Sequence, residues 1–205
     1  MIESPLSGEA DTHARIIEAA LKEFTQNGYK GASTRAIAER AGVNEVTLFR
    51  HFGSKLDLLR IAVQHAVRAM EIPEAVDQYL TMSFRSGFAA FVTEHLLQVT
   101  QHSDILMLGF AESHSHPEIA EPLMQVSWQI RKRLLQYFAA LQEQGRMRSA
   151  DTQIVAQIVM VTLHSTLAMR RRAPVEITQH LTNERIAAAL VETIVSAYGT
   201  ETAAT

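Results

Sequence analysis

Apolar residues in this chain recur every three or four positions through almost its whole length, and this periodicity limits the fold more than any other feature. In the segment 12–27, one stripe consists of Ile16, Ile17, Ala20, Leu21 and Phe24. Such spacing lines up apolar side chains on one face of an α-helix. The sequence has no run of alternating, β-branched residues bounded by hairpin turns, which would indicate strands. We therefore expect an all-α protein.

Capping and turn residues divide the first third of the chain into four helices. Ser33, Asn44 and Ser54 are residue types that favour the N-cap position. Ser54 is followed three positions later by Asp57, the spacing of a capping box with aspartate in place of glutamate. Gly42 stops the second helix. The expected spans are 12–27, 33–42, 44–52 and 54–70.

Longer helices are expected in the rest of the chain, where Pro, Gly and short polar segments mark the breaks. Their expected spans are 76–101, 104–113, 118 or 122 to 144, 151–171 and 182–198. Residues 1–10 are expected to form a flexible tail. With 205 residues, of which 47% are hydrophobic, the chain can build a substantial core in one domain or two small ones.

Charge is distributed unevenly along the chain. The net charge is −3 overall, but the segment 11–68 has nine basic and six acidic residues, which leaves −6 for the remainder. This asymmetry suggests an anion-binding head on an acidic body. The chain has no cysteine, which excludes disulfides and thiolate metal sites. No signal peptide or membrane-spanning stretch is evident, so we expect a soluble, cytoplasmic protein.

The turn Ala41-Gly42-Val43-Asn44 joins two short helices in the manner of a helix-turn-helix. Helical spacing sorts the second of these helices, NEVTLFRHF, into distinct stripes. Leu48 and Phe52 are expected to point inward. The remaining residues give the opposite side a diverse chemistry suited to contact with a ligand: Glu45, Val46, Thr47, Phe49, Arg50 and His51.

Residues 13–60, above all ASTRAIAERAGVNEVTLFRHFGSKLDLL, resemble the DNA-binding head of the TetR family of bacterial transcriptional regulators. The family pattern has a T/S-x-x-x-I-A start, an A-G-V-S turn, a T-L-Y-x-H-F recognition helix and an S-K-E-x-L opening to the next helix. Several of these elements coincide in order and spacing. The resemblance implies a DNA-binding domain over 11–56 and a ligand-binding and dimerisation domain over 57–205.

Carried over residue by residue, the resemblance implies two sets of contacts with double-stranded DNA. Contacts with the phosphate backbone, which give affinity and register, are implied for Ser33, Thr34, Thr47, His51 and Lys55. Contacts with base edges, which give sequence preference, are implied for Glu45, Val46 and Arg50, with Arg35 and Asn44 as lesser candidates.

Three positions depart from the family pattern. Phe49 stands where tyrosine is common and cannot donate a hydroxyl hydrogen bond to phosphate. Val46 occupies a position that is often small, and Glu45 brings a negative charge to the DNA-facing side. Some of these residues also have a purely structural interpretation, because Ser33, Thr47 and Ser54 could serve only in helix capping and Glu45 only as a first-turn acid.

The last two predicted helices have wide apolar bands, which require neighbours on two sides. A buried core alone could explain this width, but the resemblance implies a two-fold homodimer in which these helices pair as a four-helix bundle. The expected interface residues are Ile158, Leu163, Leu167, Leu190, Val191, Ile194 and Tyr198.

The middle helices concentrate aromatic and methionine residues, which are most often plain core. The resemblance implies a cavity there for a small apolar or aromatic effector. Its expected lining is Phe88, Phe91, Met107, Phe110, His114, Met124 and Trp128. The nearby His114-Ser115-His116 could suggest a metal site, but side chains two apart on a helix diverge. We expect neither a metal nor a cofactor.

The sequence thus predicts a ligand-responsive, sequence-specific transcriptional regulator, most simply a repressor that binds a near-palindromic operator. The alternative is an architectural or division-associated DNA-binding protein of the same fold without an effector. No Gly-rich phosphate loop or Ser/His/acid constellation supports an enzyme.

Overall fold

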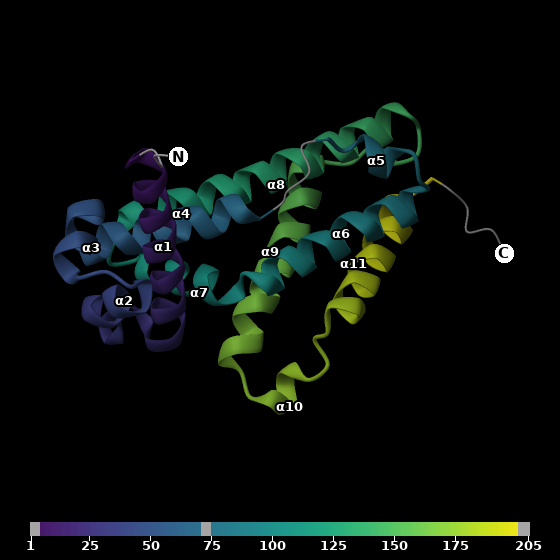
Figure 1. Ribbon diagram of the computed structural model, residues 1–205. Helices are drawn as coiled ribbons and strands as arrows, with labels where there is room; N and C mark the ends of the chain where they lie inside the picture. The colour runs from purple at the N-terminus through teal and green to yellow at the C-terminus, as the bar shows by residue number, and fades with distance from the viewer. Residues whose placement is uncertain (1–4, 71–74, 201–205) are drawn as a thin grey trace. The chain divides into compact units, whose positions relative to one another are not determined.

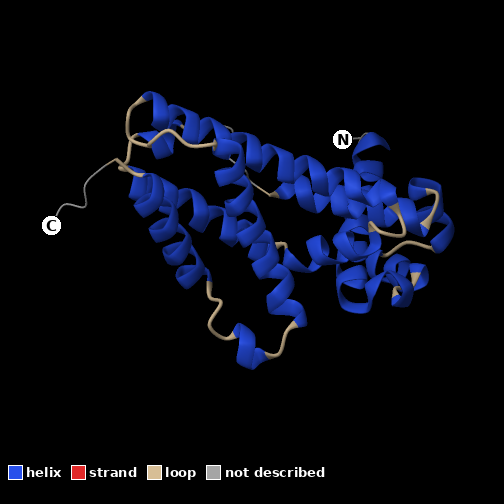
Figure 2. Cartoon of the chain, turned by 180° about the vertical axis from the view of Figure 1, so that it is seen from behind, coloured by secondary structure: helices blue, strands red, loops and turns tan. Residues whose placement is uncertain are grey.

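The computed structural model describes residues 5–70 and 75–200, and within these ranges the chain forms helices and no strand (Figures 1 and 2). Met147 and Gly199 pair in one isolated antiparallel bridge. The all-α prediction is therefore confirmed. The helices are α1 (Pro5–Gly31), α2 (Thr34–Ala41), α3 (Glu45–Phe52), α4 (Lys55–Ala69), α5 (Asp77–Leu80), α6 (Phe84–Gln101), α7 (Ser103–Glu112), α8 (Pro117–Glu143), α9 (Thr152–Arg172), α10 (Val175–Thr178) and α11 (Asn183–Tyr198).

The chain divides into two compact units. Within the described residues, the first unit comprises 5–70 and 102–126, and the second comprises 75–101 and 127–200. In the first, α1 packs against α2, α4 and α7, and α4 also packs against α7. The helix-turn-helix therefore shares a core with α4, α7 and the start of α8, because the apolar face of α4 is buried against α1.

The caps at the starts of α2, α3 and α4 follow the sequence closely. The Ser33 Oγ accepts a hydrogen bond from the Ala36 N–H at 3.4 Å, and the Asn44 Oδ1 accepts one from the Thr47 N–H at 2.8 Å. The Ser54 Oγ accepts from the Asp57 N–H at 3.0 Å and donates to the Asp57 carboxylate at 2.7 Å. These bonds satisfy N–H groups that have no partner within the helix.

The N-terminal segment differs from the prediction. Residues 5–10, expected in a flexible tail, belong to α1, which begins at Pro5 and runs to Gly31. Proline suits a first helical position because its φ is already close to helical. The helix end predicted at residue 27 corresponds to a kink in α1, because Gly28 has φ 68° and ψ 173°.

In the second unit, α6 packs against α5, α9 and α11. Its core contains a cluster of aromatic rings: Tyr79, Phe84, Phe88, Phe91, Tyr137 and Phe138. Gly87 lets the chain around Tyr79 approach α6 closely, because a Cβ at this position would lie 2.3 Å from the Tyr79 carbonyl oxygen. The Tyr79 hydroxyl donates to Glu94 Oε2 at 2.6 Å.

Two further boundaries differ from the prediction. The single helix expected over 76–101 is broken into α5 and α6, because the Ser83 Oγ accepts from the Ser86 N–H at 3.1 Å and starts a new helix. The short helix α10 follows Pro174 in a segment where no helix was expected. Of the two starts considered for α8, the earlier one is correct, and Pro122 lies within this helix.

Candidate DNA-binding surface

The two sides of α3 have the character expected of a recognition helix. Leu48 and Phe52 are buried in the first unit, whereas Val46 and Phe49 are 78% and 41% exposed. Arg50 is also exposed and makes no hydrogen bond or ion pair with the part of the chain that the structure describes. α3 therefore exposes to solvent the methyl groups of Val46, the aromatic ring of Phe49 and the guanidinium of Arg50.

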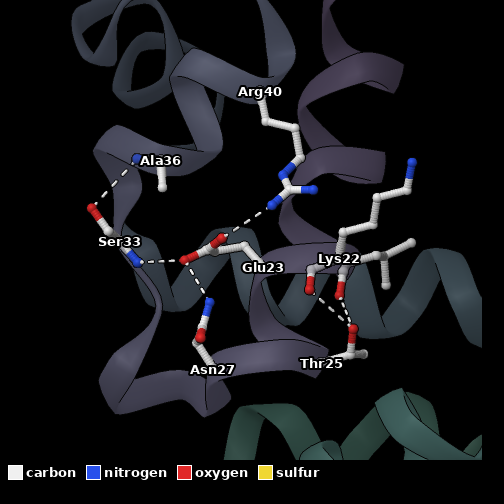
Figure 3. Close-up of polar contacts among 8 residues, drawn as sticks. Lys22, Glu23, Thr25, Asn27, Ser33, Ala36 and Arg40 are labelled. Carbon is white, nitrogen blue, oxygen red and sulfur yellow. Dashed lines mark hydrogen bonds and ion pairs between the residues drawn. The ribbon is translucent and has the colours of Figure 1, made fainter.

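A buried carboxylate that the sequence interpretation missed orients the helix-turn-helix. Glu23 of α1 is only 5% exposed, and Figure 3 shows its carboxylate between α1 and both ends of α2. Its Oε1 accepts from Asn27 Nδ2 at 2.9 Å and from the Ser33 N–H at 3.3 Å, and its Oε2 lies 3.7 Å from Arg40 Nη2. An acid directly before Phe24, on the apolar stripe of α1, is the sequence feature that could have revealed it.

Among the candidate phosphate contacts, the structure shows distinct local partners. The Ser33 hydroxyl serves the cap of α2. Lys55 Nζ lies 4.8 Å from the centroid of the Tyr29 ring, a cation–π contact that positions the start of α4. Thr47 and His51 lie partly exposed on one stripe of α3. Both side chains can therefore reach a ligand on the exposed side.

A cluster of rings supports the end of α3. The ring of His13 stacks on that of Phe52 with centroids 4.6 Å apart, and it lies 6.2 Å from the ring of His51. Burial lowers the pKa of His13, and the nearby His51 and His65 lower it further. His13 thus remains mostly neutral near pH 7 and acts as an aromatic support for α3.

The candidate base readers fall into two groups. Glu45 is committed, because its Oε1 accepts a hydrogen bond from Thr34 Oγ1 at 2.6 Å, which joins a candidate base reader to a candidate phosphate contact. Arg35 pairs with Glu39 at 2.9 Å, and Asn44 accepts the cap hydrogen bond of α3. Val46 and Arg50 are the candidates that remain free to meet a base edge.

The predicted effector residues are divided between the two compact units. Phe88 and Phe91 are buried in the aromatic core of the second unit, which supports the simple core interpretation for both. The first unit holds Met107, Phe110, His114 and Met124. In the second unit Trp128 is 59% exposed, with Arg131 5.9 Å from its ring.

A pocket of about 380 Å³ in the second unit is lined by polar and basic residues of α8, none of which was predicted: Gln129, Lys132, Arg133 and Gln136. Among the described residues, no group of three or more His, Cys, Asp or Glu could hold a metal ion.

Most of the predicted dimer residues are committed to the fold of one protomer. Leu163, Leu190, Val191 and Ile194 are buried, the last three on α11, which packs against α6. Their side chains therefore cannot also contact a partner, which corrects the prediction for these four. Ile158 is 46% exposed and Tyr198 is partly exposed. The side chain of Leu167 lies outside the described residues.

α9 is more apolar on its surface than a solvated helix. Over Thr152–Arg170 its mean hydropathy is 1.3 and 35% of the segment is buried, so by length and composition alone it could cross a bilayer. The sequence interpretation had found no such stretch. This is weak evidence for a membrane span, because core helices of soluble proteins pass the same test. Ile154, Ile158 and Val161 form an exposed stripe on this helix.

Both parts of the chain match known families. Residues 16–61 match the family described as "Bacterial regulatory proteins, tetR family". Residues 86–200, more than half of the chain, match the "AefR-like transcriptional repressor, C-terminal domain". The chain is 49% identical over 127 residues to the HTH-type transcriptional regulatory protein RaaS of Mycobacterium tuberculosis (strain ATCC 25618 / H37Rv), which covers 58% of this chain and 53% of RaaS.

Solved structures share the fold. A TetR-family transcriptional regulator from Mesorhizobium loti MAFF303099 matches with a TM-score of 0.77 at 22% identity, covering 94% of this chain and 98% of that one. A transcriptional regulator from Saccharomonospora viridis in complex with choline matches with a TM-score of 0.79 at 17% identity, covering 94% of this chain and 100% of that one. At these identities the likeness concerns the fold.

Proposed function

This chain belongs to the TetR family of bacterial transcriptional regulators, and we propose that it is a ligand-responsive repressor that binds a near-palindromic operator as a homodimer. As a member of the family it is a DNA-binding regulator. Repression is supported by the match of its larger part to the C-terminal domain of an AefR-like repressor. We place its activity in the cytoplasm, where the DNA lies.

The observation that carries the proposal is the exposed side of α3. Arg50 can donate two hydrogen bonds to the O6 and N7 of a guanine, and Val46 can pack on a thymine methyl group. Thr47, His51 and Lys55 offer donors to phosphate around this reading edge. Glu45 is held by Thr34 at the start of the helix and leaves base reading to Val46 and Arg50.

A dimer gives this small reading surface its specificity. One recognition helix contacts only a few base pairs, whereas two helices related by a two-fold axis read both halves of a palindrome. The exposed stripe of Ile154, Ile158 and Val161 on α9 supports such pairing, because a monomer would leave these side chains in water. Tyr198 of α11 joins this interface in the proposed assembly.

The effector is proposed to be a small, largely apolar molecule bound in the helical body. The complex of a protein of the same fold with choline supports small-molecule binding by this fold. The two DNA-binding domains of the dimer can lie at a spacing that fits the operator or at one that does not. An effector that binds the second arrangement more tightly shifts the dimer toward it and so weakens operator binding.

Genome-wide footprinting of the protein tests the regulatory role. We expect a few protected palindromes next to promoters, and transcription from them should rise when the gene is deleted. Many dispersed sites without an effect on transcription would instead identify an architectural DNA-binding protein. Protection of promoters whose transcription falls on deletion would identify an activator.

A further inference from the structure

Two histidines meet inside the second unit. His95 of α6 and His164 of α9 have ring centroids 5.9 Å apart, with an angle of 51° between the ring planes. His95 is only 7% exposed. Its Nε2 is fully buried and has no hydrogen-bond partner among the described residues.

This arrangement is unusual for a core. Buried polar atoms in native proteins nearly always have a partner, and a leucine would fill such a site at less cost. Several residues near the pair along α6 and α9 are buried and apolar: Phe91, Val92, Val99, Met160 and Leu163. The nearby Thr166 hydroxyl is already committed, because it donates to the Thr162 carbonyl at 2.7 Å. The Nε2 of His95 is thus a polar atom without a hydrogen-bond partner among the described residues, in a mostly apolar part of the core.

Both imidazoles are uncharged near neutral pH. Burial, and then the neighbouring His164, lower the pKa of His95 to about 3, and burial lowers the pKa of His164. No carboxylate contributes to either shift. A neutral imidazole offers one N–H donor and one nitrogen acceptor, so the pair can both donate to and accept from a bound group.

We propose that His95 and His164 form the polar end of a binding site for an uncharged hydroxyl or carbonyl group carried by an otherwise apolar small molecule. A charged group would lose its hydration here without gaining an opposite charge. A structural metal ion would need about four ligands, and the described residues supply no cluster of three. The inference rests on the proposed ligand response and identifies its chemical class.

Two probes that differ by one hydroxyl test this site. Binding of 1-naphthol and naphthalene to the full-length protein is measured by calorimetry and thermal shift. We expect the wild type to bind 1-naphthol roughly tenfold more tightly than naphthalene, the usual value of one buried hydrogen bond. In His95→Phe this preference should disappear, while His95→Gln, which keeps hydrogen-bonding groups, should retain part of it. His180→Phe, at an exposed histidine of the same unit, is the matched control and should bind like the wild type.

Four results would overturn the site: no binding of either probe, equal binding of both by the wild type, an unchanged preference in His95→Phe, or a loss of preference in the control variant. If His95→Phe fails to fold, as judged by circular dichroism, the comparison of His95→Gln and His164→Phe with the wild type decides. Release of operator DNA is followed in parallel. A hydroxyl preference without any release of DNA would support the site and contradict the proposed ligand response.

Discussion

Glu23 shows how one buried side chain can orient a DNA-binding motif. Its carboxylate accepts from Asn27 and from the Ser33 N–H, and it lies near Arg40. Replacing it by alanine leaves the Ser33 N–H and the Asn27 amide without this partner, so Glu23→Ala should lower the free energy of unfolding by about 1–3 kcal/mol. Glu18→Ala, at an exposed position of the same helix, should change it by less than about 0.5 kcal/mol.

Urea unfolding followed by circular dichroism measures both variants. Equal effects of Glu23→Ala and Glu18→Ala would mean that the buried contacts contribute little. A further check is operator affinity at a protein concentration and temperature where both variants are folded. Only Glu23→Ala should weaken it.

A substitution at Arg50 distinguishes recognition of a base from electrostatic attraction to the DNA backbone. If its guanidinium contacts a guanine, Arg50→Ala should weaken operator binding by about 1–3 kcal/mol and relax the preference at one base position. Arg35→Ala, which removes a guanidinium already paired with Glu39, serves as the matched control and should have a smaller effect. Binding selection from randomised operators measures the preference at each position. A uniform loss over all sequences would make Arg50 a phosphate contact.

The burial of His95 makes the stability of the protein depend on pH. The pKa of this residue is about 3 in the folded protein and near 6.5 in the unfolded chain, so above pH 6.5 neither state binds a proton at this ring. Below pH 6.5, His95 binds a proton in the unfolded state but stays neutral in the folded state. The free energy of unfolding therefore falls by up to about 1.4 kcal/mol for each pH unit, until about pH 3.

The pH slope can be isolated by substitution. His95→Phe removes this proton, so relative to the wild type it should gain about 2 kcal/mol between pH 7.5 and pH 5. Urea unfolding at both pH values measures the change, and the histidines other than the neighbouring His164 cancel in the difference. Parallel pH curves for the two proteins would contradict the buried, uncharged state of His95.

At the scale of elements, local patterns predicted most of the helices and tertiary contacts decided the rest. Ser33, Asn44 and Ser54 cap their helices as expected, because capping involves only neighbours in sequence. The inward side of α3 was also predicted, since its spacing alone places Leu48 and Phe52 together.

What sequence could not supply were contacts between distant residues. The bond between Thr34 and Glu45 spans eleven positions, and it turns a predicted free base reader into a committed one. The effector lining stays a prediction for a similar reason, because apolar periodicity identifies buried faces without saying which of them line a cavity. The division of the dimer set into buried and exposed residues likewise depends on how α6 covers α11.

Gly87 tests the packing between elements. A Cβ on this residue would lie 2.3 Å from the Tyr79 carbonyl oxygen and 2.7 Å from the Tyr137 hydroxyl. Since the first of these atoms is backbone, α6 and the segment around α5 would have to separate, and Gly87→Ala should lower stability by about 1–3 kcal/mol. In Gly31→Ala the added Cβ meets Asn27 at an ordinary 3.6 Å. Chemical unfolding should show little change there, and an equal loss in both variants would argue against the close approach.

At the scale of the whole molecule, the exposed stripe of α9 is the interface that we propose for the dimer, because Leu163, Leu190, Val191 and Ile194 are buried within the protomer. Ile158 lies at the middle of this stripe and is 46% exposed. A glutamate there would place two like charges at a two-fold interface and would desolvate them, whereas in a monomer it would lie in water at little cost.

Ile158→Glu should therefore convert the dimer to a folded monomer at micromolar concentration. Light scattering coupled to size-exclusion chromatography measures the mass, and circular dichroism confirms the helical content. Leu97→Glu, at a 50% exposed leucine of α6, should remain a dimer. Operator affinity should fall for Ile158→Glu alone, because a monomer reads one half-site at a time. A dimeric Ile158→Glu with normal operator binding would place the two-fold interface elsewhere on the chain.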